Sequence, residues 1–400
     1  IASTAEFTKQ FFSAELFDSF EGPLKLNNIL SSAEHQFENK IHGPESLVFK
    51  NGYLYTSTFG GTVVRIEGSQ MVPIVKIGDG NCDTLWDLEK CGRPLGLRFN
   101  SEGKLYVVDA YHGLYVIESI ETTERKVTQL LPLSATKNLQ GGESKFFDDI
   151  TIEEGAGEQG GDVIYISDVS TKWHVSSCIY TLVEYDTTGR LLRFDTDSKK
   201  LTIVDSGFVF LNGIQITDDE DSILMCELGR QRILQTFISG PKSGRTEIFA
   251  KLPGPCDNIR RSANRDHETY WVAFAFVRNS SNPVMFDRLS ESPLIRTFVS
   301  RLLYFSGELV EIVGELFYSE TLKATGYSLK KGIPFFKFVN GHGMIAEYDA
   351  NGEAITSYSS LDGKTGHLSE VCEVEGDNGE RVLYLGSYSN SYLGKLVVKK

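Results

Sequence analysis

Acidic and amide side chains recur in this sequence where strand-like segments begin. They belong to the stretches GPES, FDDI, LNGI and CDNI, and they are Glu45, Asp148, Asn212, Asp257 and Asn258. Asp and Asn are poor strand formers, so something must compensate for their position at a strand start. Carboxylates and amide carbonyls are hard oxygen donors, of the kind that Ca²⁺ binds in sets of six to eight. The set contains no His or Cys, which argues against zinc.

Taken singly, each of these residues is better explained as the cap of a turn, because Asp and Asn bond readily to nearby backbone. Taken together, at matching positions of separate segments, they favour an ion. Carboxylates crowded at one point repel one another unless a cation neutralises them. The calcium prediction therefore depends on whether the fold brings these segments together.

Short β-strands separated by turns account for nearly all of the chain. The strands are rich in Val, Ile, Tyr and Leu and end at Gly, Asp or Asn, as in residues 52–68, 103–119 and 161–168. Helical periodicity is sustained in two stretches only, FTKQFFSAELFDSF (7–20) and PLIRTFVSRLLYF (293–305).

A loose repeat gives these strands an order. Segments with a turn, a polar or small residue, a strand and a hairpin start at residues 44, 94, 147, 211, 256 and 368, at intervals of 50, 53, 64, 45 and 112. Four-stranded propeller blades need about 40 to 50 residues each, so the last interval must contain an insertion. We predict an all-β six-bladed β-propeller over 35–400, a helical lid insertion at about 283–340, and a helical or extended segment over 1–34. A pair of β-sandwich domains would not repeat one signature six times. In a propeller, the starts of the innermost strands converge on the central channel.

Composition narrows the setting of the protein. The 400 residues carry a formal charge of −14, which disfavours nucleic acid as a partner. No apolar run reaches about 18 residues, and the start at Ile1 is compatible with a removed signal peptide or N-terminal anchor. The spacing of Cys82 and Cys91 permits a loop disulfide, and Asn279 begins a glycosylation sequon. We expect an extracellular or secretory-pathway lumenal protein, and anchoring as a type II membrane protein, with this chain as the ectodomain, is compatible with that setting.

Several longer motifs resemble the strictosidine synthase-like branch of the six-bladed propellers. They are CGRPLGL (91–97), VVDAYHGLY (107–115), FFDDITI (146–152), DVIYISDVSTKW (162–173), GRLLRFDT (189–196), FLNGIQI (210–216) and GPCDNI (254–259). The resemblance covers roughly residues 35 to 398. It implies a Cys82–Cys91 disulfide and a channel-bound calcium held by Glu45, Asp148, Asn212, Asp257 and Asn258. In the wider superfamily, which includes paraoxonases and lactonases, such a calcium polarises a carbonyl or phosphoryl oxygen. Asp257 would be both a ligand and the nucleophile or general base.

Some positions depart from the patterns of that superfamily. Ser369 stands where strictosidine synthase has its catalytic Glu, and Glu370 next to it should point to the opposite face of its strand. Alkaloid condensation is therefore not expected. Leu95 and Ala110 replace the His pair of paraoxonases, and His112 lies two residues beyond. A second, deeper calcium would need two acids where this chain has Ser46 and Asp149, so it is not expected either.

Two functions remain open. The protein is either a calcium-dependent hydrolase of small hydrophobic esters or lactones, of the arylesterase type, or a non-catalytic secreted or cell-surface protein that binds a ligand around a structural calcium. The predicted helix at 293–305 is either a lid packed over the propeller or an amphipathic surface for lipid or hydrophobic substrate. Membrane association through this helix, or through a removed N-terminal anchor, is a further expectation.

Overall fold

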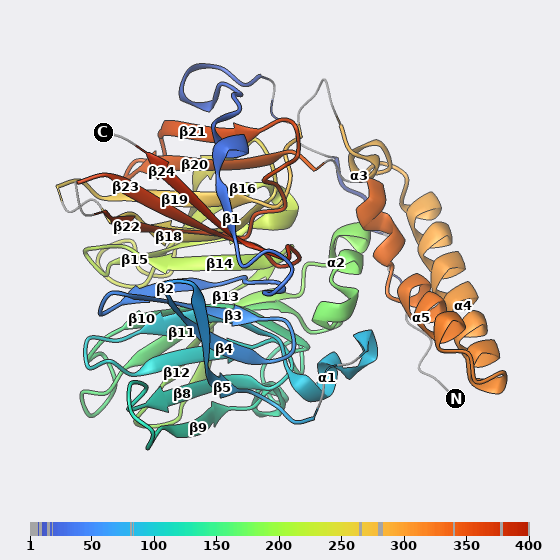
Figure 1. Ribbon diagram of the computed structural model, residues 1–400, viewed down its shortest axis with the longest axis horizontal. Coiled ribbons are helices and arrows are strands. Elements are labelled where there is room, and N and C mark those ends of the chain that lie inside the picture. The colour runs from blue at the N-terminus through green and yellow to red at the C-terminus, as the bar shows by residue number, and fades with distance from the viewer. Residues whose placement is uncertain are drawn as a thin grey trace.

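Six four-stranded antiparallel sheets surround one axis in the computed structural model (Figure 1). The structure describes residues 7, 10–13, 17, 19–80, 82, 84–263, 266–278, 283–338, 341–376 and 379–398. The prediction of an all-β six-bladed β-propeller is confirmed. The innermost strands start close to the positions from which the sequence repeats were counted.

In five blades the order of strands in the sheet is their order in the chain. Blades 1 and 2 comprise β2 (Leu47–Lys50), β3 (Tyr53–Thr58), β4 (Thr62–Glu67), β5 (Gln70–Lys76), and β6 (Pro94–Phe99), β7 (Leu105–Asp109), β8 (Gly113–Glu118), β9 (Lys126–Leu131). Blades 3 and 4 comprise β10 (Phe146–Glu153), β11 (Val163–Ser170), β12 (Gly189–Asp195), β13 (Leu201–Phe208), and β14 (Leu211–Ile216), β15 (Ser222–Glu227), β16 (Arg232–Phe237), β17 (Thr246–Lys251). Blade 5 comprises β18 (Cys256–Arg261), β19 (Thr269–Phe274), β20 (Gly343–Asp349) and β21 (Ala354–Ser360).

The sixth blade closes the ring with strands from both ends of the chain. It contains β22 (Glu370–Glu375), β23 (Arg381–Gly386), β24 (Leu393–Val398) and, at its outer edge, β1 (Glu34–Gln36). β1 pairs antiparallel with β24, with Glu34 opposite Lys395 and Gln36 opposite Leu393. This pairing covers a sheet edge and ties the start of the propeller to its end.

Apolar side chains fill the spaces between neighbouring blades, so the core is distributed around the ring. One cluster joins blade 2 to blade 3 through Tyr106, Val108, Ile150 and Ile166. Trp173 and Trp271 also pack in the core and are 7% and 1% exposed. Short helices occupy several of the connections: η1 (Gly22–Leu24), η2 (Ile29–Ser32), η3 (Leu85–Asp87), α1 (Leu88–Cys91), η4 (Leu133–Thr136), η5 (Val175–Ser177), α2 (Ile179–Glu184) and η6 (Leu228–Arg230).

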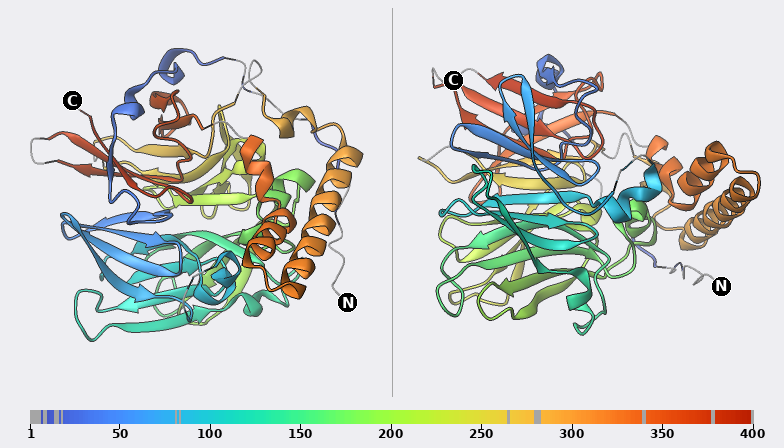
Figure 2. Two further views of the ribbon diagram at one scale, coloured as in Figure 1. Left: turned by 45° about the vertical axis from the view of Figure 1, so that its right-hand side comes forward. Right: turned by 60° about the horizontal axis from the view of Figure 1, so that its bottom comes forward.

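A helical insertion between β19 and β20 stands on one end of the propeller (Figures 1 and 2). It consists of α3 (Met285–Arg288), α4 (Pro293–Leu316), α5 (Glu320–Lys330) and η7 (Ile333–Phe338). The predicted helix is present and is longer than expected, because α4 continues to Leu316.

None of the described residues within the N-terminal stretch 7–20 is helical. Its aromatic side chains pack on separate partners instead: Phe7 contacts Trp173, Tyr180 and Tyr304, and Phe12 stacks on Tyr185.

Candidate functional site

Irregular pairing explains how poor strand formers come to lie at the start of the innermost strands. The register between β10 and β11 shifts between Phe147 and Ile150, and similar shifts occur at 211–214 in β14 and at 256–259 in β18. The residues that the regular ladder skips are Asp148 with Asp149, Asn212 with Gly213, and Asp257 with Asn258. A bulge releases a residue from pairing and re-aims its side chain. Each of these three blades therefore directs polar groups toward the axis at one level.

Gly213 shows how closely the blades approach here. A Cβ atom built on Gly213 would lie 2.4 Å from the Cα of Asn258 and 2.6 Å from its Oδ1. No side chain fits at that distance, so glycine in LNGI is required by the contact between blades 4 and 5.

A cavity of about 390 Å³ opens above these residues, on the side of the propeller that carries the helical insertion. Its floor is polar and contains Glu45, Asp148, Asn212, Asp257 and Ser369. Its walls are mostly apolar and come from several blades, from the α2 region and from η7: Leu95, Phe146, Val175, Ile179, Leu182, Phe210, Leu228, Phe276 and Phe336. The cavity thus combines apolar walls with oxygen-bearing side chains at its base, as ligand sites commonly do.

Three buried oxygen atoms at or just beneath this floor have no hydrogen-bond partner among the described residues: Oε2 of Glu45, Oδ1 of Asn212 and Oδ1 of Asn258. The other groups of the same side chains are engaged, because Asn258 donates its Nδ2 to Oε1 of Glu45 at 3.0 Å. Buried acceptors are rarely left unpaired, since each costs about 1–3 kcal/mol. The floor is therefore set up to receive a donor or a cation.

The carboxyl groups of the floor resist ionisation when no cation is present. Burial, followed by the neighbouring charges of Asp148 and Asp257, raises the pKa of Glu45 well above its usual range. Burial and then the charge of Asp257 do the same to the pKa of Asp148. Burial raises the pKa of Asp257 to about 7, although hydrogen bonds from Ser369 and Asn212 oppose the shift. Three negative charges in this space would therefore need a positive partner.

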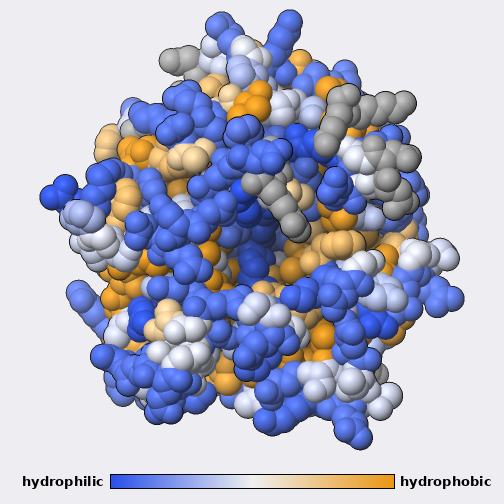
Figure 3. Space-filling view, turned by 90° about the vertical axis from the view of Figure 1, so that its left-hand side faces the viewer, coloured by the Kyte–Doolittle hydropathy of each residue, from blue (hydrophilic) through white to orange (hydrophobic). Residues whose placement is uncertain are grey.

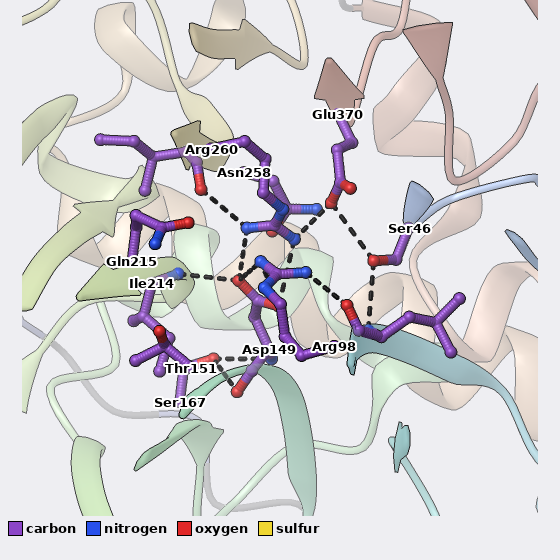
Figure 4. Close-up of polar contacts among 12 residues, drawn as sticks. Ser46, Arg98, Asp149, Thr151, Ser167, Ile214, Gln215, Asn258, Arg260 and Glu370 are labelled. Atoms are coloured by element: carbon purple, nitrogen blue, oxygen red, sulfur yellow. Dashed lines mark hydrogen bonds and ion pairs between the residues drawn. The ribbon is translucent and has the colours of Figure 1, made fainter. Parts of the chain in front are cut away.

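A second polar layer lies beneath the floor, and there the positive charge belongs to the chain itself (Figure 4). The Arg260 guanidinium binds both carboxylate oxygens of Asp149, at 2.7 and 3.1 Å, and also pairs with Glu370. Arg98 lies 3.5 Å from Asp149 on another side. Glu370 accepts hydrogen bonds from the backbone N–H of Leu47 and from Ser46. Arg260 and Arg98 thus supply the positive charge that the two carboxylates of this layer need.

The remaining predicted residues fall into place around the two layers. Ser369 lines the cavity while Glu370 points away into the lower layer, as strand alternation requires. Leu95 lines the cavity, and Ala110 is buried beside it in the same apolar cluster. His112 is not among the lining residues; its Nδ1 lies 3.3 Å from Oδ1 of Asp109, which raises the pKa of His112.

Two other sequence predictions concern loops. Cys82 and Cys91 form the expected disulfide. Asn279 lies outside the described residues.

The far end of the propeller, opposite the helical insertion, has a central hollow around the axis, where hydrophilic residues gather (Figure 3).

Two side chains that line the cavity were missed by sequence reasoning, His367 and Cys178. His367 has a left-handed backbone (φ 52°) in the turn before β22, and burial lowers its pKa. A single His in a loop carries no sequence signal of its own, and the available pointer to the cavity is its position two residues before Ser369. Burial raises the pKa of Cys178 to about 12, so its thiol is not a reactive thiolate.

Comparison with known proteins agrees with this geometry. A family model of strictosidine synthase matches residues 148–241, and a model of the strictosidine synthase-like N-terminal region matches residues 22–66. Adipocyte plasma membrane-associated protein of Rattus norvegicus is 33% identical over 94% of this chain and 88% of its own length. The chain belongs to this family of strictosidine synthase-like propellers. Other members include the Homo sapiens protein of the same name (32% identical, 94% of this chain, 80% of its own length) and hemomucin of Drosophila melanogaster (28%, 94%, 62%).

Solved structures support the fold of this strictosidine synthase-like chain. A gluconolactonase from Xanthomonas campestris is 10% identical, with a TM-score of 0.53 over 93% of this chain and 92% of its own. Regucalcin from Agrobacterium tumefaciens, described as a calcium-binding protein, is 11% identical, with a TM-score of 0.51 over 92% and 95%. At such identities the likeness concerns the fold alone.

Two kinds of feature, a metal-binding group of His, Cys, Asp or Glu and a membrane-spanning helix, are absent from the described residues. No group of three or more His, Cys, Asp or Glu side chains in this part of the chain meets the criteria for a metal site. Within the same residues, no helix is both long and apolar enough to cross a membrane.

Proposed function

We propose that this protein binds Ca²⁺ on the floor of its cavity and hydrolyses small hydrophobic esters or lactones there. The observation that supports the proposal is the set of unpartnered buried oxygens of Glu45, Asn212 and Asn258, next to two further carboxylates. Among the described residues, Glu45, Asp148 and Asp257 do not by themselves form a metal-binding group of three carboxylates, so the proposed site depends also on the amide oxygens of Asn212 and Asn258. Carboxylate and amide oxygens are the donors that Ca²⁺ prefers.

The chain contributes the following parts of the chemistry. Asp257 faces the cavity from β18 and is oriented by hydrogen bonds with Ser369 and Asn212, so it can accept a proton from an attacking water. The water oxygen then bonds to the carbonyl carbon, the ester C–O bond breaks, and the alcohol leaves with a proton. Asp257, which has taken up the proton of the water, returns it to the alcohol oxygen as the C–O bond breaks. When bound, Ca²⁺ would stabilise the developing oxyanion.

The apolar walls define the class of substrate. Phe146, Phe210, Phe276 and Phe336 surround the cavity, and its polar groups are confined to one end. A compact aryl or alkyl ester, or a lactone, buries its apolar part against these rings while its carbonyl faces the floor. Charged or strongly hydrated substrates would leave polar groups unpaired at the walls.

Hydrolysis of phenyl acetate tests the proposal. The buffer contains about 1 mM CaCl₂, a concentration in the range of the dissociation constants of extracellular calcium modules. We expect the wild type to hydrolyse the ester, EDTA to abolish the activity, and Asp257→Asn to lower it by about 10²-fold or more with unchanged circular dichroism. Asp218→Asn, at an exposed ion pair, is the matched control and should retain activity. Rates equal to those of boiled protein would reject the hydrolase.

A non-catalytic function is the second candidate, and one observation favours it. Leu95 and Ala110, at the positions of the paraoxonase His pair, are buried apolar residues, so blade 2 offers no acid–base group to the cavity at this place. In that case the calcium would be structural and the cavity would hold a ligand of the cell surface without converting it. Calcium should then raise the melting temperature of the protein while ester hydrolysis is absent.

We also propose that the protein works outside the cytosol, in the extracellular space or the secretory-pathway lumen. The Cys82–Cys91 disulfide supports this, since such bonds persist in oxidising compartments. The relatives' names describe plasma membrane-associated proteins, which supports a location at a membrane.

A further inference from the structure

Helix α4 presents a continuous apolar stripe to the outside of the molecule. Seven large side chains along it are 48–69% exposed: Ile295, Phe298, Leu302, Phe305, Leu309, Ile312 and Leu316. In Figures 1 and 2, α4 lies at the outer edge of the helical insertion, on the far side of α5 from much of the propeller. A stripe of this size on a helix is exceptional for a protein surface and indicates an interaction site.

The inner face of α4 shows that this exposure is built into the sequence. Gly307 and Gly314 face α5, where a Cβ atom on Gly307 would lie 2.3 Å from the backbone N of Lys330. Gly326 of α5 is equally close, because its Cβ would lie 2.4 Å from the backbone N of Glu311. Although Val299, Leu303 and Tyr304 pack inward, the face of α4 that meets α5 is built from glycine, and the large apolar residues of the stripe remain outside, unlike those of an ordinary surface helix.

The spacing of the exposed residues is that of a coiled coil. Successive members of the stripe are separated by three, four, three, four, three and four positions from Ile295 to Leu316. Such alternation is the heptad pattern of a and d positions, whose partner is another helix. The 24 residues of α4 extend about 36 Å, enough for three heptads.

The charges that flank the stripe identify the other helix. Arg301 and Glu308 both occupy g positions of this heptad, and neither has an ion-pair partner among the described residues. If a second α4 runs antiparallel so that the two helices cross between Leu303 and Tyr304, Leu302 packs against Phe305 of the second copy. In that register Arg301 faces Glu308 of the second copy, and the symmetry makes the same pair twice. A parallel pair would place Arg301 opposite Ser306 and Glu308 opposite Val313, without a charge partner.

We propose that the protein forms a twofold homodimer through an antiparallel α4–α4 coiled coil. The other occupant expected of such a stripe, a lipid surface, fits less well. Helices that lie in a membrane interface are rich in Lys and Arg on their polar face. Here the exposed flank carries Arg301 against Glu308 and Glu315, and the chain has a formal charge of −14. The lysines Lys323 and Lys330 of the adjoining α5 are already paired with Glu320 and Glu311.

Sedimentation equilibrium tests the dimer. Wild-type protein should have about twice the 44.6 kDa mass of one chain. Phe305→Glu, which places two charges in the core, should be monomeric, and Ile248→Glu, an equally exposed site on β17, should remain dimeric. A monomeric wild type, or a Phe305→Glu variant that still dimerises, would overturn the proposal. A wild type that is monomeric but floats with phosphatidylcholine–phosphatidylserine vesicles would assign the stripe to lipid instead.

Charge exchange tests the register. Arg301→Glu and Glu308→Arg should each weaken dimerisation by about tenfold, because each sets like charges opposite one another twice. The double variant restores both pairs and should dimerise like the wild type. Equal mixtures of Leu302→Cys and Phe305→Cys chains should form an oxidative cross-link that neither chain forms alone. A cross-link of Leu302→Cys with itself would indicate a parallel pair and reject this geometry.

Discussion

Arg260 and Asp149 form a two-point ion pair inside the propeller channel, with Nη1 2.7 Å from Oδ2 and Nη2 3.1 Å from Oδ1. The residue before Asp149 is Asp148, which lines the cavity above. Adjacent acids of one bulged strand thus serve two layers. In the lower layer the chain provides its own cation, whereas in the upper layer none of the carboxylates forms an ion pair among the described residues, and Arg93 and Arg260 act on them only from a distance. This difference is why we expect a metal ion in the upper layer only.

Removal of the Arg260 guanidinium should strongly destabilise the fold. In Arg260→Met, Asp149 and Glu370 would keep their burial and lose their main counter-charge, a change that costs about 3–5 kcal/mol in buried ion pairs. Arg261→Met is the matched control, because Arg261 pairs with the half-exposed Asp218 and should cost less than about 1 kcal/mol. Urea unfolding of both variants measures the difference. Equal losses would show that the channel pair does not stabilise the propeller.

Calcium affinity should increase with pH across the neutral range. The metal binds ionised carboxylates, and burial raises the pKa of Asp257 to about 7, so binding must displace protons below that pH. Isothermal titration at pH 5.5, 6.5 and 7.5 should give a dissociation constant that falls at each step. A constant affinity over this range would mean that Asp257 is not a ligand.

The metal-free protein should show the opposite trend in stability. A carboxyl group whose pKa is higher in the folded state binds more protons there, so its contribution to stability is full below about pH 3.8 and is lost as pH rises to about 7. With EDTA present, thermal unfolding should therefore occur at a lower temperature at pH 7.5 than at pH 5.5. Asp257→Asn should reduce this dependence, and an unchanged slope would count against the burial of that carboxyl group.

The fold, and the end of the innermost strands at which the polar residues gather, could be predicted from the sequence because the blades repeat. Each blade carries its own turn and strand signals, so several weak local patterns support one another. The acids and amides at 45, 148, 212, 257 and 258 could be grouped because they occupy the same place in different repeats.

Features that depend on pairing between distant blades could not be read in this way. Asp149 and Arg260 are separated by 111 positions, and the sequence around either residue does not predict that the two form an ion pair. His367 enters the cavity through a left-handed turn that its neighbours in sequence do not require. For α4, periodicity predicted the helix but assigned its apolar side to packing or to lipid. Only the contacts of Gly307 and Gly314 show which face is inside.

Loss of the Cys82–Cys91 bond should destabilise the loop between blades 1 and 2. The bridge closes a loop with a sequence separation of 9, for which chain entropy gives about 2.5 kcal/mol of stabilisation. A Cys82→Ser/Cys91→Ser variant should melt below the wild type, and addition of a reductant should lower the wild type toward the variant. Reductant should leave the variant unchanged, because its other cysteines are free thiols.

Gly307→Leu should release α4 from α5 without unfolding the propeller. The added side chain would start 2.3 Å from the backbone N of Lys330, and backbone cannot yield as a flexible side chain does. Overpacking of this kind costs about 1–3 kcal/mol, and the cost falls on a helix pair that lies outside the six blades. Hydrogen exchange should therefore accelerate in 293–330 while the amides of β10 and β11 stay protected. Thr321→Leu, at an exposed position of α5, should change neither region. If Gly307→Leu also exposed the amides of β10, the helical insertion and the propeller would form one cooperative unit, and the lid could not move independently of the site that it covers.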